Sequence, residues 1–210
     1  MDVVIVGASG HGMVVCDALL LQGMRVLAFI DADVAKHGSR VLDIPVVAGI
    51  SQVAAAGRPA IVMGIGGNAA RRREFERWRS DGYEILGVRH PSAAVSPRAR
   101  IGVGAVILAN VVVNVAAEVG DNVILNSSCS VDHHCVIGAH THIAPSATLA
   151  GDVRVGGETL IGAGAVVIQG ISIGSRTVLG AGAVAVRDIG DDVTCVGVPA
   201  RAVEARQTTR

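Results

Sequence analysis

An aliphatic residue recurs at every sixth position through the second half of the chain. Val, Ile or Leu occupies each position of this series without interruption: Val95, Ile101, Ile107, Val113, Val119, Leu125, Val131, Ile137, Ile143, Leu149, Val155, Ile161, Val167, Ile173 and Leu179. Four residues beyond each of these stands a small or β-branched residue, from Ala99 to Ala183. A fixed internal period indicates a solenoid, in which each repeat packs only on its neighbours.

Two inward positions in every six residues, one large and one small, are what a triangular parallel β-helix requires. Each hexad forms one flat face, three faces form a coil, and glycine at the second hexad position, as at Gly102 and Gly120, suits backbone near a corner. The repeat predicts about five left-handed coils over residues 95–184. Residues 192–203 (DVTCVGVPARAV) leave the repeat and are expected to cap the open end, which would otherwise pair with other strands.

Composition narrows the kind of partner and the compartment. The 210 residues include 27 glycines and only four aromatic residues, so the core must consist of short aliphatic side chains. Lys+Arg and Asp+Glu balance at 18 each, which argues against nucleic-acid or anionic-membrane partners. No apolar run reaches the roughly 18 residues of a membrane span. The four cysteines form no CxxC pair and are interpreted as reduced thiols of a soluble, cytoplasmic protein, with Cys129 and Cys135 in the small inward slot rather than on a metal.

Residues 1–90 follow a different pattern, in which strands alternate with helices. Strands are predicted at residues 3–7, 25–29, 61–66 and 84–88, and helices at residues 11–23 and 68–82. This alternation predicts a Rossmann-like module with a parallel sheet and right-handed crossovers. The segment HPSAAVSP (90–97) is the expected hinge. The predicted domains are therefore an α/β module at 1–90 and a left-handed β-helix of hexapeptide repeats with a C-terminal cap at 91–210.

A glycine-rich loop, Gly7 to Gly12, follows the first strand and opens the first helix. It is interpreted as a phosphate loop of the G-x-G-x-x-G type, where a helix N-terminus offers free N–H groups to an anion. Asp31 ends the second strand and is placed to accept hydrogen bonds from a ribose or base. About 90 residues give room for one mononucleotide half, so a nucleotide diphosphate is favoured, and a glycine turn without ligand is the alternative. The arginines at 71–73 are expected to form a solvent-exposed helix face rather than a phosphate clamp.

Four histidines fall in one ten-residue window of the repeat, at 133, 134, 140 and 142. His133 and His134 stand at a predicted corner, so their side chains are expected to point outward. Gly151 follows His133 by one coil of 18 residues, which would place backbone without a side chain beside the imidazole. A general base next to an exposed N–H suits acyl transfer. Surface histidines without a role are the alternative.

The motifs GASGHG, SVDHHCVIG, HIAPSATLAG, IGAGAVVI and VGVPAR together resemble the NeuD/PglD group of sugar O- and N-acetyltransferases over essentially the whole chain. The resemblance implies a homotrimer with active sites between neighbouring β-helices, acetyl-CoA as cosubstrate, a nucleotide-sugar acceptor and no metal. The resemblance also implies that His133 is the general base and that Asn126 lies near the acceptor sugar. It implies that His142 and Gly151 meet the acetyl-CoA thioester, with the Gly151 N–H as oxyanion donor. The nucleotide-sugar site implied by the resemblance contains Gly10, His11, Gly12 and Asp31, with Gly66 and Asn68 at its edge.

One position departs from that family. Where the family carries Asp or Glu after the base, this chain has His134, and Asp132 is a candidate replacement although a direct sequence neighbour can point away. The departure keeps open a catalytically weak nucleotide-sugar-binding homologue. A γ-type carbonic anhydrase-like zinc enzyme is a further alternative, permitted by the local histidines but opposed by the N-terminal module. The nucleotide, the sugar and the choice between amine and hydroxyl stay open.

Overall fold

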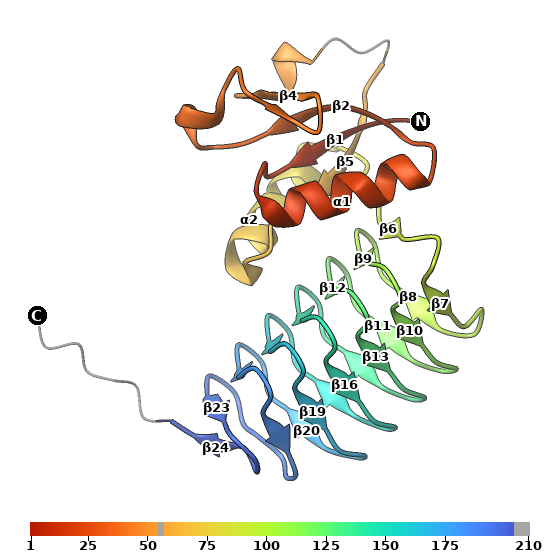
Figure 1. Cartoon of the computed structure of the whole chain (residues 1–210), viewed down its shortest axis with the longest axis vertical. Coiled ribbons are helices and arrows are strands. Elements are labelled where there is room, and N and C mark those ends of the chain that lie inside the picture. Colours follow the sequence, from red (N-terminus) through yellow and green to blue (C-terminus); the bar gives the residue numbers. More distant parts are fainter. Residues whose placement is uncertain (54–56, 204–210) are drawn as a thin grey trace, which may run out of the picture.

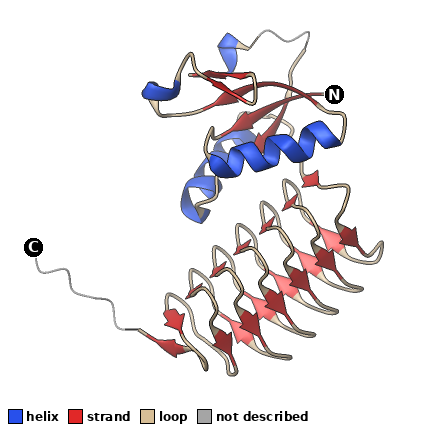
Figure 2. Ribbon diagram, viewed as in Figure 1, coloured by secondary structure: helices blue, strands red, loops and turns tan. Residues whose placement is uncertain are grey.

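The computed structural model describes residues 1–53 and 57–203, which form an α/β module seated on one side of a three-sided β-helix (Figure 1). Figure 2 shows that the helices belong to the module, while the β-helix consists of short strands joined by tight turns. No helix within the described ranges is long and apolar enough to cross a membrane. The predicted fold class, a Rossmann-like module followed by a left-handed parallel β-helix, is confirmed.

The module is built around a five-stranded sheet in the order β3-β4-β2-β1-β5. Its elements are β1 (Asp2–Val6), α1 (Gly10–Leu21), β2 (Arg25–Ile30), η1 (Val34–Lys36), β3 (Arg40–Val41), β4 (Ile44–Val47), η2 (Ile50–Gln52), β5 (Ala60–Met63) and α2 (Asn68–Ser80). All neighbours are parallel except β3, which runs antiparallel to β4. The first three predicted strands and both predicted helices are confirmed, and the hairpin of β3 and β4 is an addition.

The strand predicted at residues 84–88 is wrong as a member of this sheet. Only an isolated bridge joins Ile85 to Ile61, and Val88 already belongs to the β-helix through β6 (Val88–Arg89). At Gly87 the chain passes so close to the next coil that an added Cβ would lie 2.8 Å from the carbonyl oxygen of Ala105. The segment therefore leaves the module before it can form a full edge strand.

The β-helix has three faces, each built from parallel strands that recur every 18 residues until the last two strands of the third face. Val112 pairs with Ser130, and Ser130 pairs with Thr148. The first face contains β7 (Ala94–Val95), β10 (Val112–Val113), β13 (Ser130–Val131), β16 (Thr148–Leu149), β19 (Val166–Val167) and β22 (Val184–Ala185). The second contains β8 (Arg100–Ile101), β11 (Glu118–Val119), β14 (Val136–Ile137), β17 (Arg154–Val155) and β20 (Ser172–Ile173). The third contains β6, β9 (Val106–Ile107), β12 (Ile124–Leu125), β15 (His142–Ile143), β18 (Leu160–Ile161), β21 (Val178–Leu179), β23 (Thr194–Val196) and β24 (Arg201–Ala202).

The large and small slots of each hexad both point inward, as the period predicts. Leu125 and Ile143 from the large slot, and Cys129 and Cys135 from the small slot, are completely buried. Ile101 is the most exposed residue of the two series at 38%, because it lies in the first coil, at the open end of the stack, and Val95, Ala99 and Ile171 are partly buried. Packing of successive layers thus supplies the core that the scarcity of aromatic residues requires.

The corners carry a left-handed residue at almost every sixth position. Positive φ angles occur at Gly104, Asn110, Ala116, Asn122, Ser128, His134, His140, Ser146, Asp152, Glu158, Gly164, Gly170, Arg176 and Gly182. Most of these are not glycine, so the turn itself imposes the conformation. The glycines at the second hexad position have a different cause: at Gly120, for example, a Cβ would lie 2.8 Å from the backbone nitrogen of Ala139 in the next coil.

The α/β module and the third face of the β-helix share one hydrophobic core. Ile5 and Leu19 of the module pack in the same cluster as Val106, Leu108 and Ile124 of the β-helix. The outward side chains of β9 and β12 are consequently buried on this face. At the far end β23 continues the stack beside β21, and β24 turns back antiparallel to β23.

Candidate active site

The glycine-rich loop places the N-terminus of α1 at the carboxyl ends of β1 and β5. Gly7 adopts a φ of +106°, and a Cβ on Gly12 would collide with the carbonyl oxygen of Gly7. The spacing is G-x-x-G-x-G rather than G-x-G-x-x-G, so the loop differs from the dinucleotide fingerprint in which glycine meets the phosphate. Gly10 has open space around it. The first helical hydrogen bond runs from Met13 N–H to Ser9 C=O, which leaves the helix N-terminus available to an anion.

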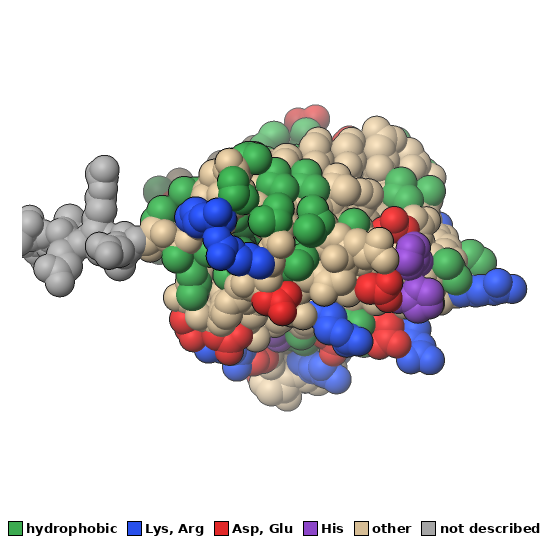
Figure 3. All heavy atoms as spheres, turned by 90° about the horizontal axis from the view of Figure 1, so that it is seen from below, with side chains coloured by type: hydrophobic (Ala, Val, Ile, Leu, Met, Phe, Trp, Pro, Cys, Tyr) green, Lys and Arg blue, Asp and Glu red, His purple; other side chains and the backbone are tan. Residues whose placement is uncertain are grey.

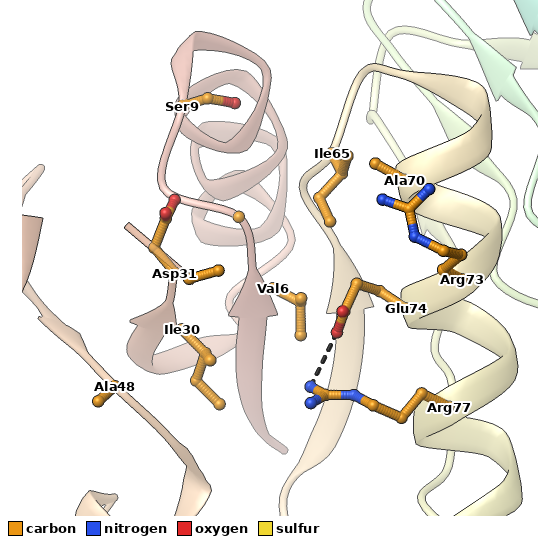
Figure 4. Close-up of a pocket in the computed structure, with 12 residues that line it drawn as sticks. Val6, Ser9, Ile30, Asp31, Ala48, Ile65, Ala70, Arg73, Glu74 and Arg77 are labelled. Atoms are coloured by element: carbon orange, nitrogen blue, oxygen red, sulfur yellow. Dashed lines mark ion pairs between the residues drawn. The ribbon is translucent and has the colours of Figure 1, made fainter. Parts of the chain in front are cut away.

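A cavity of about 370 Å³ opens beside this loop (Figure 4). Its lining comes from the ends of the strands and from one side of α2: Val6, Gly7, Ser9, Ile30, Asp31, Ala32, Ala48, Ile65, Ala70, Arg73, Glu74 and Arg77. Arg77 is paired with Glu74 at 2.8 Å, whereas no ion pair is formed by Arg73 within the described residues. The carboxyl edge of a parallel sheet is where ligands bind in folds of this class.

Asp31 lines that cavity but its carboxylate is already engaged by the protein. It accepts hydrogen bonds from the backbone N–H of Ala8 (2.7 Å) and of Asp33 (2.9 Å), and from the Lys36 ammonium (2.9 Å). Burial alone would raise the pKa of Asp31, yet these donors outweigh it and lower the pKa. The carboxylate therefore holds the glycine loop in place, and contact with a ribose would have to use its remaining acceptor capacity.

Arg71 overturns the expectation that all three arginines of α2 face solvent. Arg72 and Arg73 are exposed, but Arg71 is completely buried. Its guanidinium donates to the carbonyl oxygens of Ile65, Gly66, Asn122, His140 and Thr141 and to the side-chain oxygen of Asn68. Burial lowers its pKa to about 10, so the group keeps its charge at neutral pH. Arg71 thus joins the loop at Ile65 and Gly66, called the cavity loop below, to the β-helix.

Asn68 and Gly66 belong to the same junction. The Asn68 amide donates to the carbonyl oxygens of Glu158 (2.9 Å) and Thr159 (3.0 Å) in the β-helix. The Gly66 carbonyl accepts from Arg71 at 2.9 Å, and its Cα faces His11, since a Cβ there would lie 3.8 Å from the His11 Cβ. Both residues are near the predicted nucleotide-sugar site, but Asn68 is committed to holding the two modules together.

His11, His142 and Asn126 form a polar group between the module and the third face of the β-helix. The rings of His11 and His142 lie 6.2 Å apart, and the Asn126 amide nitrogen is 3.1 Å from Nε2 of His142. Burial, assisted by the Arg71 charge, lowers the pKa of both histidines to about 4, so both are neutral at pH 7. The Nε2 atom of His11 is buried and has no hydrogen-bond partner among the described residues. A polar ligand would satisfy it.

His133 and Gly151 meet at a different corner, where the first face turns into the second. A Cβ on Gly151 would overlap the imidazole of His133 and lie 2.6 Å from Nε2. Asp152 N–H donates to the His133 carbonyl at 3.0 Å, which locks the two coils in register at this point. The Gly151 N–H donates to no acceptor within the described part of the chain. The contact between His133 and Gly151 that the 18-residue spacing predicts is therefore present.

The histidine after His133 faces it directly. Nδ1 of His133 and Nδ1 of His134 are 3.0 Å apart, so one of them carries a proton and donates it to the other. Asp132 does not reach the ring: its Oδ1 accepts from the His133 backbone N–H (2.7 Å) and from the Asn114 amide (2.7 Å). These hydrogen bonds lower the Asp132 pKa and hold the corner backbone.

Within one chain the predicted site residues fall into two separate groups. His142 and Asn126 lie on the third face beside the module, while His133 and Gly151 lie at the corner between the other two faces. The predicted pairing of His142 with Gly151 around one thioester is therefore not formed inside a single chain.

Sequence reasoning missed the roles of Arg71, Arg73 and Arg77. Arg73 and Arg77 are four residues apart on α2, a spacing that puts them on one side of the helix, and this signal could have been read. Arg71 could not have been singled out, because its carbonyl partners in the β-helix, at Asn122, His140 and Thr141, are 51, 69 and 70 positions away in the sequence.

Each half of the chain matches the model of a known protein family. Residues 2–78 match the family model of the PglD N-terminal domain, and residues 116–151 match that of the bacterial transferase hexapeptide (six repeats). A variant of perosamine N-acetyltransferase from Caulobacter crescentus, solved with CoA and GDP-perosamine, is 37% identical with a TM-score of 0.90, covering 98% of each chain. The acetyltransferase domain of PglB from Neisseria gonorrhoeae is 36% identical with a TM-score of 0.88, covering 96% of this chain and 99% of that one.

A third structure, WeeI from Acinetobacter baumannii, is 26% identical with a TM-score of 0.89 and covers 97% of this chain and 100% of that one. The agreement extends through both the α/β module and the β-helix, with sequence identity above 30% over nearly the full length for two of the three proteins. The chain is an acyltransferase and belongs to the NeuD/PglD family of sugar acetyltransferases.

Proposed function

We propose that the protein transfers the acetyl group of acetyl-CoA to an amine of a nucleotide-linked sugar, with His133 as the general base. The observation that carries the proposal is the contact between His133 and Gly151, which puts an imidazole next to an unoccupied backbone N–H. An amine is favoured over a hydroxyl because the similar Caulobacter protein is described as an N-acetyltransferase of perosamine.

The chemistry needs only these two groups at the reacting atoms. His133 removes a proton from the sugar amine as its nitrogen attacks the thioester carbonyl, and the Gly151 N–H stabilises the oxyanion. If Nδ1 of His133 donates to His134, Nε2 is unprotonated and faces Gly151, the tautomer that a base requires. A general base contributes roughly 10²–10⁴-fold and one oxyanion donor about 10²–10³-fold. The cysteines are buried, and burial raises the pKa of Cys129 to about 12, so no thiolate is available as a nucleophile.

The nucleotide is assigned to the cavity of the α/β module. Its diphosphate would approach the N–H groups of Gly10, His11 and Gly12, and Arg73, which forms no ion pair among the residues described, supplies a positive charge at the cavity wall. His11, His142 and Asn126 would then receive the sugar, since neutral imidazoles can donate or accept hydrogen bonds. In this assignment residues 1–90 hold the nucleotide-sugar and residues 91–210 hold acetyl-CoA, with β6 joining the two.

We also propose that the enzyme is a homotrimer in which the base of one chain completes the sugar site of its neighbour. The separation of the two residue groups within one chain supports this, because neither group is sufficient alone. Exposed aliphatic side chains line the same corner as His133. Val115 lies one coil below His133, and Ile168 lies one coil above Ala150. Figure 3 shows hydrophobic side chains gathered on the face seen from below. Such a patch is expected to be covered by protein.

A cytoplasmic location is proposed as well, because the free cysteines at 16, 129, 135 and 195 suit a reducing compartment in which acetyl-CoA is available. The family assignment leaves the zinc-hydratase alternative without support.

The test is release of free CoA thiol from acetyl-CoA in the presence of GDP- and UDP-linked sugars, each with an amino or a hydroxyl group at the same carbon. Turnover is expected only with an amino sugar. His133→Asn should lower kcat by at least about 10²-fold while the acetyl-CoA Kd, measured by calorimetry, stays within about twofold. Binding of a nucleotide-sugar without any turnover would favour the catalytically weak homologue instead, and normal turnover by the variant would remove His133 from the mechanism.

A further inference from the structure

A base that becomes an imidazolium during attack is stabilised by negative charge close to its far nitrogen. Among the described residues His133 makes no hydrogen bond to a carboxylate there, because its Nδ1 faces the ring of His134. The rings stand edge to face, with centroids 5.2 Å apart and an interplanar angle of 81°. The question is which carboxylate could stabilise this pair of imidazoles once His133 gains a proton.

Asp132 is close in sequence but its acceptor atom is already used. Its Oδ1 receives the backbone N–H of His133 and the amide of Asn114, both at 2.7 Å. Asp132 makes no hydrogen bond to the imidazole within the described residues, so its charge acts on that ring only through space.

Asp152 approaches the pair from the next coil. One of its carboxylate oxygens and one ring nitrogen of each histidine all lie within 4.8 Å of one another. The backbone fixes this arrangement, because Asp152 N–H donates to the carbonyl oxygen of His133 at 3.0 Å. Position 152 is also the αL corner residue directly above position 134, with φ angles of 62° and 57°. The αL residue one coil below, Ala116, has no charge to offer.

We infer that Asp152 is a positioning residue that acts on the base through His134. The inference rests on the proposed role of His133. In this proposal His133 donates Nδ1–H to Nδ1 of His134, and the second nitrogen of His134, Nε2, keeps its proton and is the group assigned to Asp152. When His133 takes the amine proton on Nε2, the carboxylate stabilises the resulting positive pair. The C–N bond then forms, the C–S bond breaks, and His133 returns the proton to the departing thiolate of CoA.

A carboxylate-exchange cycle tests this. Asp152→Asn should lower kcat about tenfold with little change in KM for acetyl-CoA, because the lost charge matters in the transition state and Asn also tolerates the αL conformation. His134→Asp supplies a carboxylate to His133 directly. In that background Asp152→Asn should cost less than about twofold. The matched control is Asp192→Asn, a carboxylate removed from an αL position at a different corner, which should leave kcat unchanged.

The tautomers give a second readout that does not depend on turnover. Nitrogen NMR of the wild-type protein should show His133 protonated on Nδ1 and His134 on Nε2, and Asp152→Asn should convert these into mixtures. Equal losses of kcat in both backgrounds, or unchanged tautomers in Asp152→Asn, would overturn the inference. A wild-type protein that is inactive on every acceptor but has the expected tautomers would count against the proposed function, whereas active protein with unchanged tautomers in Asp152→Asn would count against the inference alone.

Discussion

Gly151 is a residue whose whole contribution is the absence of a side chain. Its φ lies outside the left-handed region, so the backbone accepts other residues, but a Cβ would overlap the His133 ring. Gly151→Val is therefore expected to fold and to lose at least about 10²-fold in kcat, the effect of removing a base or an oxyanion donor. The measurement is thiol release, with light scattering to show that assembly is intact.

Gly190→Val is the matched control for that substitution, because no atom lies within 4 Å of where its Cβ would be and its φ is also not positive. It should keep wild-type turnover. If Gly151→Val acetylated at the same rate as this control, the His133 ring would have another place to go and the acyl site would lie elsewhere.

The buried histidines His11 and His142 predict how stability depends on pH. Both have a pKa of about 4 when folded, against about 6.5 in an unfolded chain, because burial disfavours the charged form. Between these values the unfolded state binds more protons, so the free energy of unfolding falls as the pH falls from 6.5 toward 4. Each group should contribute a slope of up to about 1.4 kcal/mol per pH unit.

Urea unfolding of the wild type and of a His11→Gln/His142→Gln variant between pH 5 and 7.5 measures that slope. The variant should lose the part of the slope that the two histidines contribute and keep the part due to other groups. Parallel curves for the two proteins would show that the histidines titrate normally and are not kept neutral by burial.

At the residue scale the sequence predicted which residues lie one above another in neighbouring coils, but not which hydrogen bonds their side chains form. The 18-residue spacing is enough to place Gly151 beside His133, because parallel strands in a β-helix repeat with a fixed register. It could not reveal that Asp132 turns to the backbone, or that Asp31 is held by three donors, since these depend on side-chain rotation. The sequence shows that His134 stands where the family has a carboxylate, and the structure adds that His134 occupies an αL corner.

Helix α2 is the element on which the junction between the two modules depends. Arg71 is buried with six oxygen acceptors drawn from the cavity loop, from α2 itself and from two coils of the β-helix. Arg71→Leu would leave several buried carbonyls without a donor, at roughly 1–3 kcal/mol for each unsatisfied group. We expect a loss of about 3 kcal/mol or more in the free energy of unfolding, measured with denaturant.

Arg72→Leu is the control at the neighbouring position, where the side chain is exposed and its ion pairs with Glu76 and Glu158 are worth little. It should change stability by less than about 1 kcal/mol. Equal effects from the two substitutions would mean that Arg71 is not the residue that fastens the module to the β-helix.

The elements themselves were predictable to different degrees. The hexads predicted every strand of the β-helix from β7 to β21, because one large aliphatic residue per face is a signal with no competing interpretation. The segment at residues 84–88 has the same apolar composition as a sheet strand and misled the prediction. This segment does not join the sheet because Gly87 lies close to the next coil, a tertiary contact that the local sequence does not reveal.

At the scale of the whole molecule, the assembly is the next quantity to measure. Light scattering of the purified protein at micromolar concentration should give the mass of three chains. Replacing the exposed aliphatic residues Val115 and Ile168 with Asp should shift the mass toward one chain and reduce turnover together, because charge at a desolvated interface is costly. A single-chain mass for the wild type, with full activity, would show that one chain contains a complete site.

The 18-residue register also gives the β-helix something like a reading frame. Loss of one residue inside it would move every following aliphatic side chain from the core to the surface, and loss of six would move each strand to the neighbouring face. Only a change of 18 restores both packing and face, and it would still carry His133 and Gly151 past the α/β module. The pairing of Val178 with Thr194, a step of 16 rather than 18, marks where this frame ends. Relatives should therefore vary in length at the two ends of the stack or by loops at its corners, and keep the spacing between the base and its glycine.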